Sequence, residues 1–473
     1  IPGEKGTIKV SSLAALTVDK KNYHHGDASI QNTCIGLAQE IVCKGDNIGL
    51  LHQGGQFGTR WKMGKDHASP RYIWTKLGQI TPSLFLAKFK PILKIKFIEG
   101  QECEPDDLPS VIPPVYNNTS GIGTGWSTGF PPFDPLDLAI AVKCKLMGNK
   151  YPILMPWYKG YKGQLIMKPR KPKVIKKVME KVDEHSGDED EAPVEQKEMT
   201  DAEATGMVDN DDSGDLKTEV MMDADTTMYI ESWGTYDYDN KGHIHVTELP
   251  VGMSTFKYQN YLKKLIENGD LDSFDHNNTA YTVRFILKGL KSTSPAKLGL
   301  SRTIGMSNFW LLDDEVPRKF ADVYEFIDVW YLKMITYYEK YKAHMIKDLT
   351  NKISDINYKI MYIDLVLKKE IPAAGLKTDD LKQRLQGYDI PYDMIKGTTA
   401  GQMTVEGLEK LKAQSNKLTQ ELEAAKVMDI RQIWMEDLDH FIKEYSRIYK
   451  RQVRPYQARQ DVYKGYLTRI GDG

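Results

Sequence analysis

The most regular pattern of apolar and polar residues lies between Pro317 and Pro372, a stretch that contains no Gly and no other Pro. Apolar residues recur there every three or four positions, which is the spacing of one face of an α-helix. The stripe consists of Met345, Leu349, Ile353, Ile356, Ile360, Ile363 and Leu367. A helix of about 50 residues would be about 75 Å long at 1.5 Å per residue, so it needs a partner helix to bury its stripe.

A second stripe with the same spacing follows the first. Its members are Leu408, Leu411, Leu418, Leu422 and Ala425. The segment between the stripes, about 371–405, contains Gly and Pro, so the chain is predicted to turn back on itself. We therefore predict an antiparallel coiled coil with a small helical domain at its tip, within residues 313–473. Two core helices of an ordinary bundle are the alternative, which the length disfavours.

Shorter patterns fill the N-terminal segment 1–108. Apolar residues at helical spacing predict a helix over Ser29–Val42, with Ser29 as its N-cap. We predict a short strand over Ile48–Leu51 after a KGDN turn. A second helix is predicted within Ala68–Ile80, beginning at or after Pro70. Helices joined by tight turns, with a short β element, suit a winged-helix domain.

The segment 109–312 is rich in Gly, Pro, Val and Ile. Strands are predicted in YIESWGTYDYD, HIHVTELP and YTVRFILKGL, which favours an α+β domain. The whole chain is thus predicted to be multidomain α+β. Residues 183–225 interrupt this segment with 17 Asp and Glu against 2 Lys, and almost no aromatic residues. We predict a disordered acidic insertion there and assign it no metal, because such carboxylates are usually solvated.

Charge and composition narrow the classes of function. The formal net charge of −1 hides a basic remainder, since outside 183–225 there are 62 basic and 48 acidic residues. That excess fits a surface that binds a polyanion such as nucleic acid, and equally a solvated basic surface. No run of about 18 apolar residues predicts a membrane span. Four scattered cysteines favour a reducing compartment over a disulfide framework. The start at Ile1 suggests a fragment of a longer protein.

Residues that could carry chemistry cluster between Tyr23 and Tyr72, in YHHGD, GGQFGTR and GKDHASPRYIWT. A tyrosine has an ordinary pKa near 10, so as a nucleophile it needs a base or positive charge nearby. Arg71 and a histidine could supply these, and an arginine can also clamp a phosphate with two hydrogen bonds. Taken singly, an Arg–Tyr pair is more often an ordinary surface pair.

The combination of motifs resembles the breakage-reunion region of type IIA DNA topoisomerases of the eukaryotic and large-DNA-virus type. The matching motifs occur in the family's order: YHHGD (23–27), LAQEI (37–41), GGQFGTR (54–60), GKDHASPRYIWT (64–75) and GIGTGWSTGFPPFDP (121–135). WYKGYKGQL (157–165) and IWMEDLDHF (433–441) extend the likeness over most of the chain.

The resemblance implies a role for particular residues. Tyr72 would attack a backbone phosphate and stay linked to the 5′ end of the broken strand. Arg71 and His25 would assist at the same phosphate. Ile122, between Gly121 and Gly123, would be an apolar wedge pushed between base pairs, although without the resemblance a buried Ile in a glycine turn would be favoured. Further DNA contacts would come from basic and imidazole side chains: His24, Arg60, Lys62 and Lys65.

The same resemblance implies parts that this sequence does not contain. Neither the family's ATPase domain nor its Toprim domain, whose carboxylates hold Mg²⁺, can be identified, and no phosphate-binding loop motif occurs. ATP and Mg²⁺ would therefore serve the whole enzyme at sites outside this chain. The implied segments are a winged-helix domain (1–108), a tower domain (109–312) and a coiled coil with C-gate (313–473). We expect this chain alone to bind and bend DNA but to cleave it poorly.

The expected partners are double-stranded DNA and a second copy of the chain, joined through the C-gate, with no membrane involved. We expect an intracellular location, in the nucleus or, for a viral protein, at a cytoplasmic replication site. Two alternatives remain: a non-catalytic module that binds and bends DNA, and a coiled-coil structural protein whose N-terminal motifs are coincidental. Loss of a covalent DNA adduct in Tyr72→Phe would separate the first reading from both.

Overall fold

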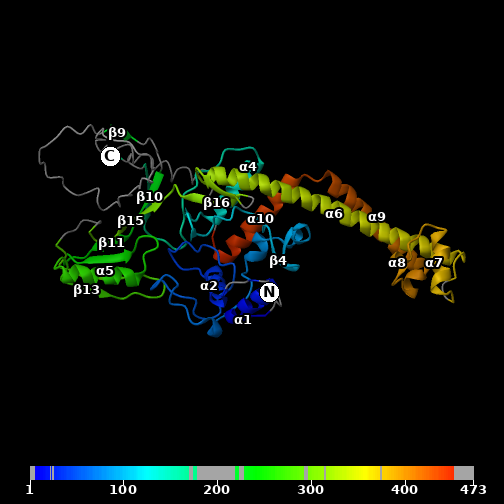
Figure 1. Ribbon diagram of the computed structural model, residues 1–473, viewed down its shortest axis with the longest axis horizontal. Helices are drawn as coiled ribbons and strands as arrows, with labels where there is room; N and C mark the ends of the chain where they lie inside the picture. Colours follow the sequence, from blue (N-terminus) through cyan, green and yellow to red (C-terminus); the bar gives the residue numbers. More distant parts are fainter. Residues whose placement is uncertain are drawn as a thin grey trace, which may run out of the picture. The chain divides into compact units, whose positions relative to one another are not determined.

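The computed structural model of the chain describes residues 6–21, 23, 26–169, 174–177, 219–222, 228–291, 297–313, 316–372 and 375–451. The chain forms two compact units, one made of residues 1–166 and 230–473 and the other of residues 167–229. Helices and strands both contribute to the first unit (Figure 1). The predicted mixture of helix and sheet is therefore confirmed.

The longer helices are α1 (Val10–Lys21), α2 (Asp27–Ala38), α4 (Pro135–Leu146), α5 (Thr255–Glu267), α6 (Val323–Leu367), α7 (Thr378–Gln386), α9 (Val405–Val427) and α10 (Ile430–Tyr449). Two helices have a single turn, α3 (Thr81–Leu84) and α8 (Tyr392–Ile395). Short 3₁₀ segments lie at Pro70–Tyr72, Ala87–Ile92 and Ala400–Met403.

Most strands pair as antiparallel hairpins. These are β3 (Ile95–Ile98) with β4 (Gln101–Pro105), β5 (Thr119–Gly123) with β6 (Trp126–Phe130), and β16 (Phe309–Asp313) with β17 (Val316–Phe320). β1 (Ile8–Lys9) pairs with β2 (Trp74–Thr75), and β10 (Met228–Trp233) lies next to β15 (Ser301–Gly305). In the second unit, β8 (Val174–Lys177) pairs with β9 (Glu219–Met222), while β7 (Gln164–Pro169) spans the boundary between the units.

A small N-terminal core forms where α1 and α2 pack against the β1–β2 pair. Its buried side chains include Cys34 and Ile35 of α2 and Ile73 next to β2. The predicted helix is thus present, but it begins at Asp27 after Gly26, so Ser29 is not its N-cap. The Ser29 hydroxyl instead accepts a hydrogen bond from Tyr23 at 3.2 Å. The predicted strand at Ile48–Leu51 is wrong, because only one bridge, from Leu51 to Leu77, forms there.

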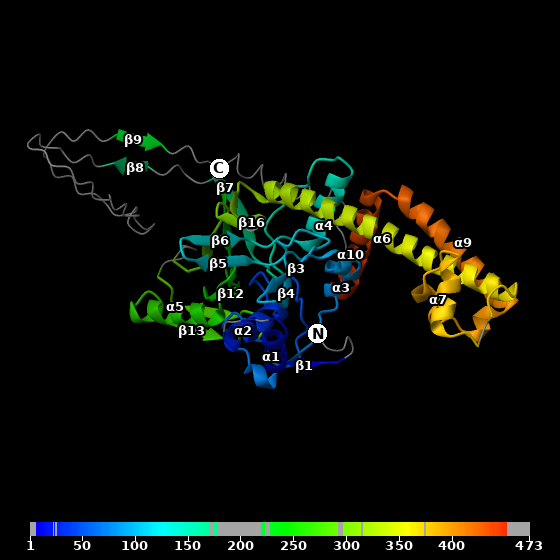
Figure 2. The ribbon, with the colours of Figure 1, turned by 45° about the vertical axis from the view of Figure 1, so that its right-hand side comes forward.

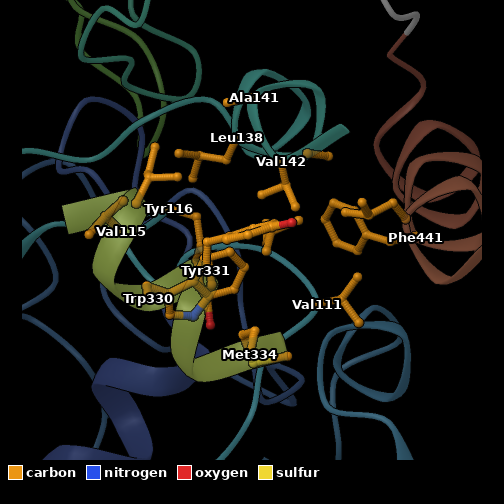
Figure 3. Packing of buried hydrophobic residues seen from close by; sticks show 14 of the residues in the cluster. Val111, Val115, Tyr116, Leu138, Ala141, Val142, Trp330, Tyr331, Met334 and Phe441 are labelled. Carbon is orange, nitrogen blue, oxygen red and sulfur yellow. The ribbon is translucent and has the colours of Figure 1, made fainter. Parts of the chain in front are cut away.

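The largest core joins segments that are far apart in the sequence. Helices α4, α6 and α10 meet over residues 111–116 (Figure 3). Figure 3 shows Leu138 and Val142 of α4 above the ring of Tyr331 from α6, with Phe441 of α10 beside them. Trp434 is fully buried, and its ring stacks on that of Tyr331 with centroids 5.3 Å apart. The end of the described chain is therefore fixed to the same core as residues 48–154.

A separate layer of sheet and helix, called here the sheet–helix layer, has its own core. Its strands lie in the order β11 (Thr235–Tyr238), β12 (Ile244–Glu248), β14 (Phe285–Lys288) and β13 (Ser273–His276). Helix α5 covers one face, with Ser254 as its N-cap (Figure 1). The three strand segments predicted from the sequence coincide with β10–β11, β12 and β14, so these predictions are confirmed.

Helices α6 and α9 lie side by side and form a two-helix arm (Figure 2). Its helices are antiparallel, because Asn357 meets Ser415 whereas Lys342, earlier in the chain, meets Met428. Helix α6 has 45 residues and α9 has 23, as the two stripes predict. Ile363, Leu408 and Leu411 are buried in a core at the far end, where α7 and α8 also pack.

Several predictions fall on parts of the chain outside the described residues. The acidic insertion 183–225 lies outside them except for residues 219–222, which form β9 rather than a disordered segment. His24 and His25 also lie outside the described residues. No helix in the described ranges is both long and apolar enough to cross a membrane.

Candidate functional site

Tyr72 lies at the end of a single 3₁₀ turn, Pro70–Tyr72, and its side chain is 71% exposed. The amide of Tyr72 donates to the carbonyl of Ser69 at 2.9 Å, which closes the turn. The next residue, Ile73, is 1% exposed and belongs to the N-terminal core. A buried anchor directly after an exposed hydroxyl fixes where the tyrosine points without covering it.

The predicted helix over Ala68–Ile80 is wrong beyond this one turn. From Trp74 the chain becomes strand β2, which pairs with β1. Trp74 also exchanges two backbone hydrogen bonds with Gly54, both of 2.8 Å. The β-branched residues Ile73 and Thr75 favour an extended backbone, and this pairing outweighs the helical spacing.

Residues 54–68 form a closed loop that precedes the tyrosine, called here the glycine loop. The amide of Ala68 donates to the carbonyl of Gln56 at 2.9 Å and closes its base. Gly58 and Gly64 pack against each other so tightly that a Cβ on Gly58 would lie 2.5 Å from the Cα of Gly64. Gly58 also has φ of +100°, a conformation that favours glycine. The motif's glycines therefore set the shape of the loop.

The cations of the site differ in how accessible they are. The side chains of Arg71, Lys62 and Lys65 are exposed, so these three are free to approach a phosphate. Arg60 is 2% exposed, and its guanidinium is bound to the carboxylate of Glu248. The structure differs here from the sequence-based prediction: Arg60 is part of an internal ion pair and not of a DNA-facing surface.

The second candidate element is the β5–β6 hairpin. Ile122 is opposite Ser127 in the ladder and its side chain is 94% exposed, so it is not a core residue. Ile122 lies within strand β5 rather than in the turn itself, and the turn follows at 124–125. Gly121 and Gly123 flank it, and a Cβ on either would meet no atom closer than 3.7 Å. The hairpin is slim on both sides of Ile122.

The base of this hairpin is fixed to the main core. Phe130 at the end of β6 is fully buried and stacks on Phe309 of β16, with ring centroids 4.2 Å apart. Trp126 packs edge-on against Trp310 at 4.7 Å, and the side-chain amide of Asn308 donates to the Ser127 hydroxyl at 3.1 Å. These contacts hold the hairpin so that Ile122 points away from its own fold.

A cleft of about 470 Å³ opens at the base of the hairpin. Gly129 and Asn308 line one side, Met63 of the glycine loop contributes, and Arg302 of β15 lies across from them. Arg302 is exposed, and one of its guanidinium nitrogens donates to the Val251 carbonyl at 3.2 Å. Arg302 has no carboxylate in salt-bridge distance within the described part of the chain, so it can pair with an external anion. Sequence reasoning missed it, because no motif surrounds it.

The chemistry of the thiols is suppressed by burial. All four cysteines are free and buried. Burial raises the pKa of the Cys43 thiol to about 12, and it also raises the pKa of Cys34 and Cys144. At neutral pH the Cys43 thiol stays protonated and is a poor nucleophile. Tyr72 is thus the exposed nucleophile that the candidate site offers.

No group of three or more His, Cys, Asp or Glu side chains in the described ranges is arranged to hold a metal ion. The carboxylates that the resemblance implies for Mg²⁺ do not have a counterpart among these residues. The described site consists instead of a tyrosine hydroxyl, exposed cations and an apolar wedge.

A family comparison agrees with this geometry. The model of the DNA gyrase/topoisomerase IV family, in its A-type polypeptide, matches residues 2–198 and 212–439. The mitochondrial DNA topoisomerase 2 of Dictyostelium discoideum is 26% identical over 464 residues, covering 93% of this chain and 31% of the relative. DNA topoisomerase 2 of Bombyx mori is 42% identical over 163 residues, which is 34% of this chain and 10% of the relative. The chain thus spans at most about a third of these relatives.

The fold is also similar to a solved structure. The DNA-binding, cleavage and re-ligation domain of Plasmodium falciparum topoisomerase II superposes with a TM-score of 0.74. The match covers 98% of this chain and 59% of that chain, at 21% sequence identity. The likeness therefore extends over nearly the whole architecture.

Proposed function

The chain belongs to the DNA gyrase/topoisomerase IV family, and we propose that it is the DNA breakage and reunion portion of a type IIA topoisomerase. The observation that carries this proposal is Tyr72: an exposed hydroxyl between a closed glycine loop and a buried anchor residue. Exposed cations precede it in the loop and adjoin it at Arg71. In the whole protein, this portion would serve ATP-dependent passage of one duplex through another.

In the proposed reaction the Tyr72 hydroxyl oxygen attacks a backbone phosphorus. A bond forms between this oxygen and the phosphorus, and the bond from phosphorus to the 3′ oxygen breaks. The tyrosine proton leaves and the 3′ oxygen gains a proton, so the strand ends in a 3′ hydroxyl and a 5′ phosphotyrosine. Attack by the 3′ hydroxyl reverses these steps and restores both the strand and the tyrosine.

Arg71 is proposed to stabilise the charge that develops on the phosphate, since its guanidinium is exposed directly beside the nucleophile. His25 is proposed to assist and His24 to contact DNA, from the YHHGD motif. Lys62, Lys65 and Arg302 are proposed to neutralise neighbouring phosphates without reading sequence. Mg²⁺ supplies charge stabilisation at the scissile phosphate when bound, and we propose that its ligands, like the ATP site, belong to other parts of the whole protein.

Ile122 is proposed to enter the duplex between base pairs, flanked by Gly121 and Gly123. An aliphatic side chain that is almost entirely exposed would cost free energy in water and gain it between bases. The slim flanks support this, because neither glycine carries a side chain that would collide with the groove. Bending of the DNA would follow from the unstacked step.

The finer architecture is part of the same proposal. We propose a winged-helix domain for 1–108, a tower domain for 109–312, and a coiled coil with C-gate for 313–473. The helices and β1–β2 pair of the first segment and the antiparallel α6–α9 arm of the third support this division. Double-stranded DNA and a second copy of the chain, joined at the tip of the arm, would be the partners.

The test is detection of DNA covalently attached to protein. The whole protein that contains this chain is incubated with Mg²⁺ and end-labelled duplex DNA, and the reaction is stopped with detergent. Tyr72→Phe should abolish the adduct, whereas Tyr281→Phe should leave it unchanged, because Tyr281 is a comparably exposed tyrosine in another loop. An adduct that persists in Tyr72→Phe refutes the proposed chemistry and leaves DNA bending without cleavage as the function.

A further inference from the structure

We propose that Arg60 and Glu248 are positioning residues for the reaction at Tyr72, acting as a buried clamp between the glycine loop and the sheet–helix layer. This inference rests on the proposed function, since it concerns the same nucleophile. Neither residue touches the reacting atoms. Their effect would come through the placement of the loop that carries Lys62 and Lys65 and leads into the turn of Tyr72.

Glu248 collects donors from several distant parts of the chain. Both it and Arg60 are 2% exposed. One carboxylate oxygen accepts from the Arg60 guanidinium and from the amide of Leu249, the latter at 2.9 Å. The other oxygen accepts from the amide of Lys162 at 3.3 Å and lies 3.9 Å from the Cys43 sulfur, which donates to it. The carboxylate is thus a junction of β12 with the glycine loop and residues 43 and 162.

The Arg60 side depends on this one carboxylate. Its Nε atom is buried and has no hydrogen-bond partner within the part of the chain that the structure describes. Removing the charge of Glu248 would leave a buried guanidinium without compensation, which a protein relieves by moving the residue toward water. Any such movement displaces the glycine loop, since Arg60 is part of it.

Backbone and ring contacts strengthen the same clamp. The amide of Arg60 donates to the carbonyl of Ala280 at 3.1 Å, and the amide of Phe256 donates to the carbonyl of Trp61 at 3.1 Å. The rings of Trp61 and Phe256 meet edge-on at 5.3 Å, and the Lys62 ammonium lies 5.3 Å from the centre of the Phe256 ring. The tip of the loop is therefore attached to helix α5 and to the loop before β14.

The base of the loop transmits this attachment to the nucleophile. The hydrogen bond from Ala68 to Gln56 lies before Tyr72, and the paired bonds between Gly54 and Trp74 lie after it. Tyr72 sits between these two fixed points. A shift of about 1 Å in a reacting group can cost about a hundredfold in rate, so a displaced loop should impair cleavage even where DNA still binds.

The first experiment separates positioning from binding. In the whole protein with Mg²⁺, Glu248→Gln should slow adduct formation by at least about tenfold. DNA affinity, measured in a Tyr72→Phe background, should stay within about threefold because no DNA-facing cation is removed. Equal losses in adduct formation and DNA affinity would overturn the inference, as would a folded Glu248→Gln protein with an unchanged rate. An absence of adduct in the unmodified protein would instead refute the proposed function.

A second pair of variants keeps the test decisive if Glu248→Gln does not fold. Phe256 is 38% exposed, so Phe256→Ala removes the ring contact of the clamp with little loss of core. Tyr238→Ala is its control, because Tyr238 is 53% exposed on β11 of the same layer and packs on Tyr236 rather than on the loop. We expect Phe256→Ala alone to slow adduct formation, by about threefold to tenfold, at an unchanged melting temperature. Identical rates in the two variants would contradict the clamp.

Discussion

The glycine loop and the β5–β6 hairpin both present an exposed candidate residue from a glycine-rich segment, but they support it in different ways. In the loop, Gly58 and Gly64 lie where no side chain fits, and Tyr72 is followed by a buried anchor. In the hairpin, Gly121 and Gly123 face open space and Ile122 has no buried neighbour of that kind. The loop's glycines serve the fold, whereas the hairpin's glycines leave room for something outside it.

This difference matches what each residue is proposed to do. Transfer of a phosphate to a hydroxyl depends on exact alignment, so the nucleophile needs a rigid and closely packed support. A wedge needs only a stiff mount and slim flanks, which a two-stranded ladder anchored by Phe130 supplies. Four substitutions test whether the two regions differ in this sense.

The largest effect on stability is expected for Gly58→Ala. Its Cβ would lie 2.5 Å from the backbone of Gly64, at a φ of +100° that side chains rarely adopt. We expect the free energy of unfolding to fall by at least about 2 kcal/mol, measured by chemical denaturation. A melting curve identical to that of the unmodified protein would show that the loop is less tightly packed than described.

The next effect concerns the exposed cations of the loop. Replacing Lys62 and Lys65 together by Ala should weaken binding to any DNA sequence and flatten the dependence of log affinity on log salt by about 1.8. Stability should change little, since both side chains are exposed. Affinity measured across a salt series checks this, with Lys410→Ala on the exposed face of α9 as a control. An unchanged salt slope would remove these lysines from the DNA interface.

Ile122→Gly should act on DNA shape rather than on the protein. Loss of the wedge should reduce DNA bending, measured by energy transfer between dyes at the two DNA ends, while salt-sensitive binding largely remains. The free energy of unfolding should change by no more than about 0.5 kcal/mol, because the side chain is almost fully exposed in the free protein. Unchanged bending would count against the wedge.

The smallest effect is expected for Gly121→Ala. The nearest atom to an added Cβ is the Thr128 methyl carbon at 3.7 Å, which is ordinary contact. The free energy of unfolding should therefore stay within about 0.5 kcal/mol. Set beside Gly58→Ala, it measures the contrast between the two glycine-rich segments in one quantity. Equal destabilisation by both substitutions would abolish that contrast.

Long periodic segments of the fold were predictable from the sequence, and short ones were not. The stripes of α6 and α9 repeat often enough to determine both helices and their partnership. The segment Ala68–Ile80 has a helical spacing too, but its pairing with Gly54 and Lys9 decides the outcome, and no local pattern reveals those partners. Ser29 failed as an N-cap because the helix begins earlier, at Asp27.

The site follows the same rule of locality. Tyr72, Arg71 and Ile122 stand in compact motifs, and the structure finds all three exposed. Arg60 stands in the same motif as the loop glycines, yet its partner Glu248 is 188 residues away, so its burial could not be foreseen. Arg302 became a candidate only when β15 was seen to face the hairpin across a cleft.

The polar contact inside the α6–α9 arm has a mechanical consequence. The Ser415 hydroxyl donates to the Asn357 side chain at 2.8 Å in a seam that is otherwise mainly apolar. Sliding one helix past the other by a turn would break this bond and leave half-buried polar groups without partners, so it fixes the register of the arm. The arm therefore cannot work as a piston. Motion at its tip has to come from bending of the helices or from rotation at their ends.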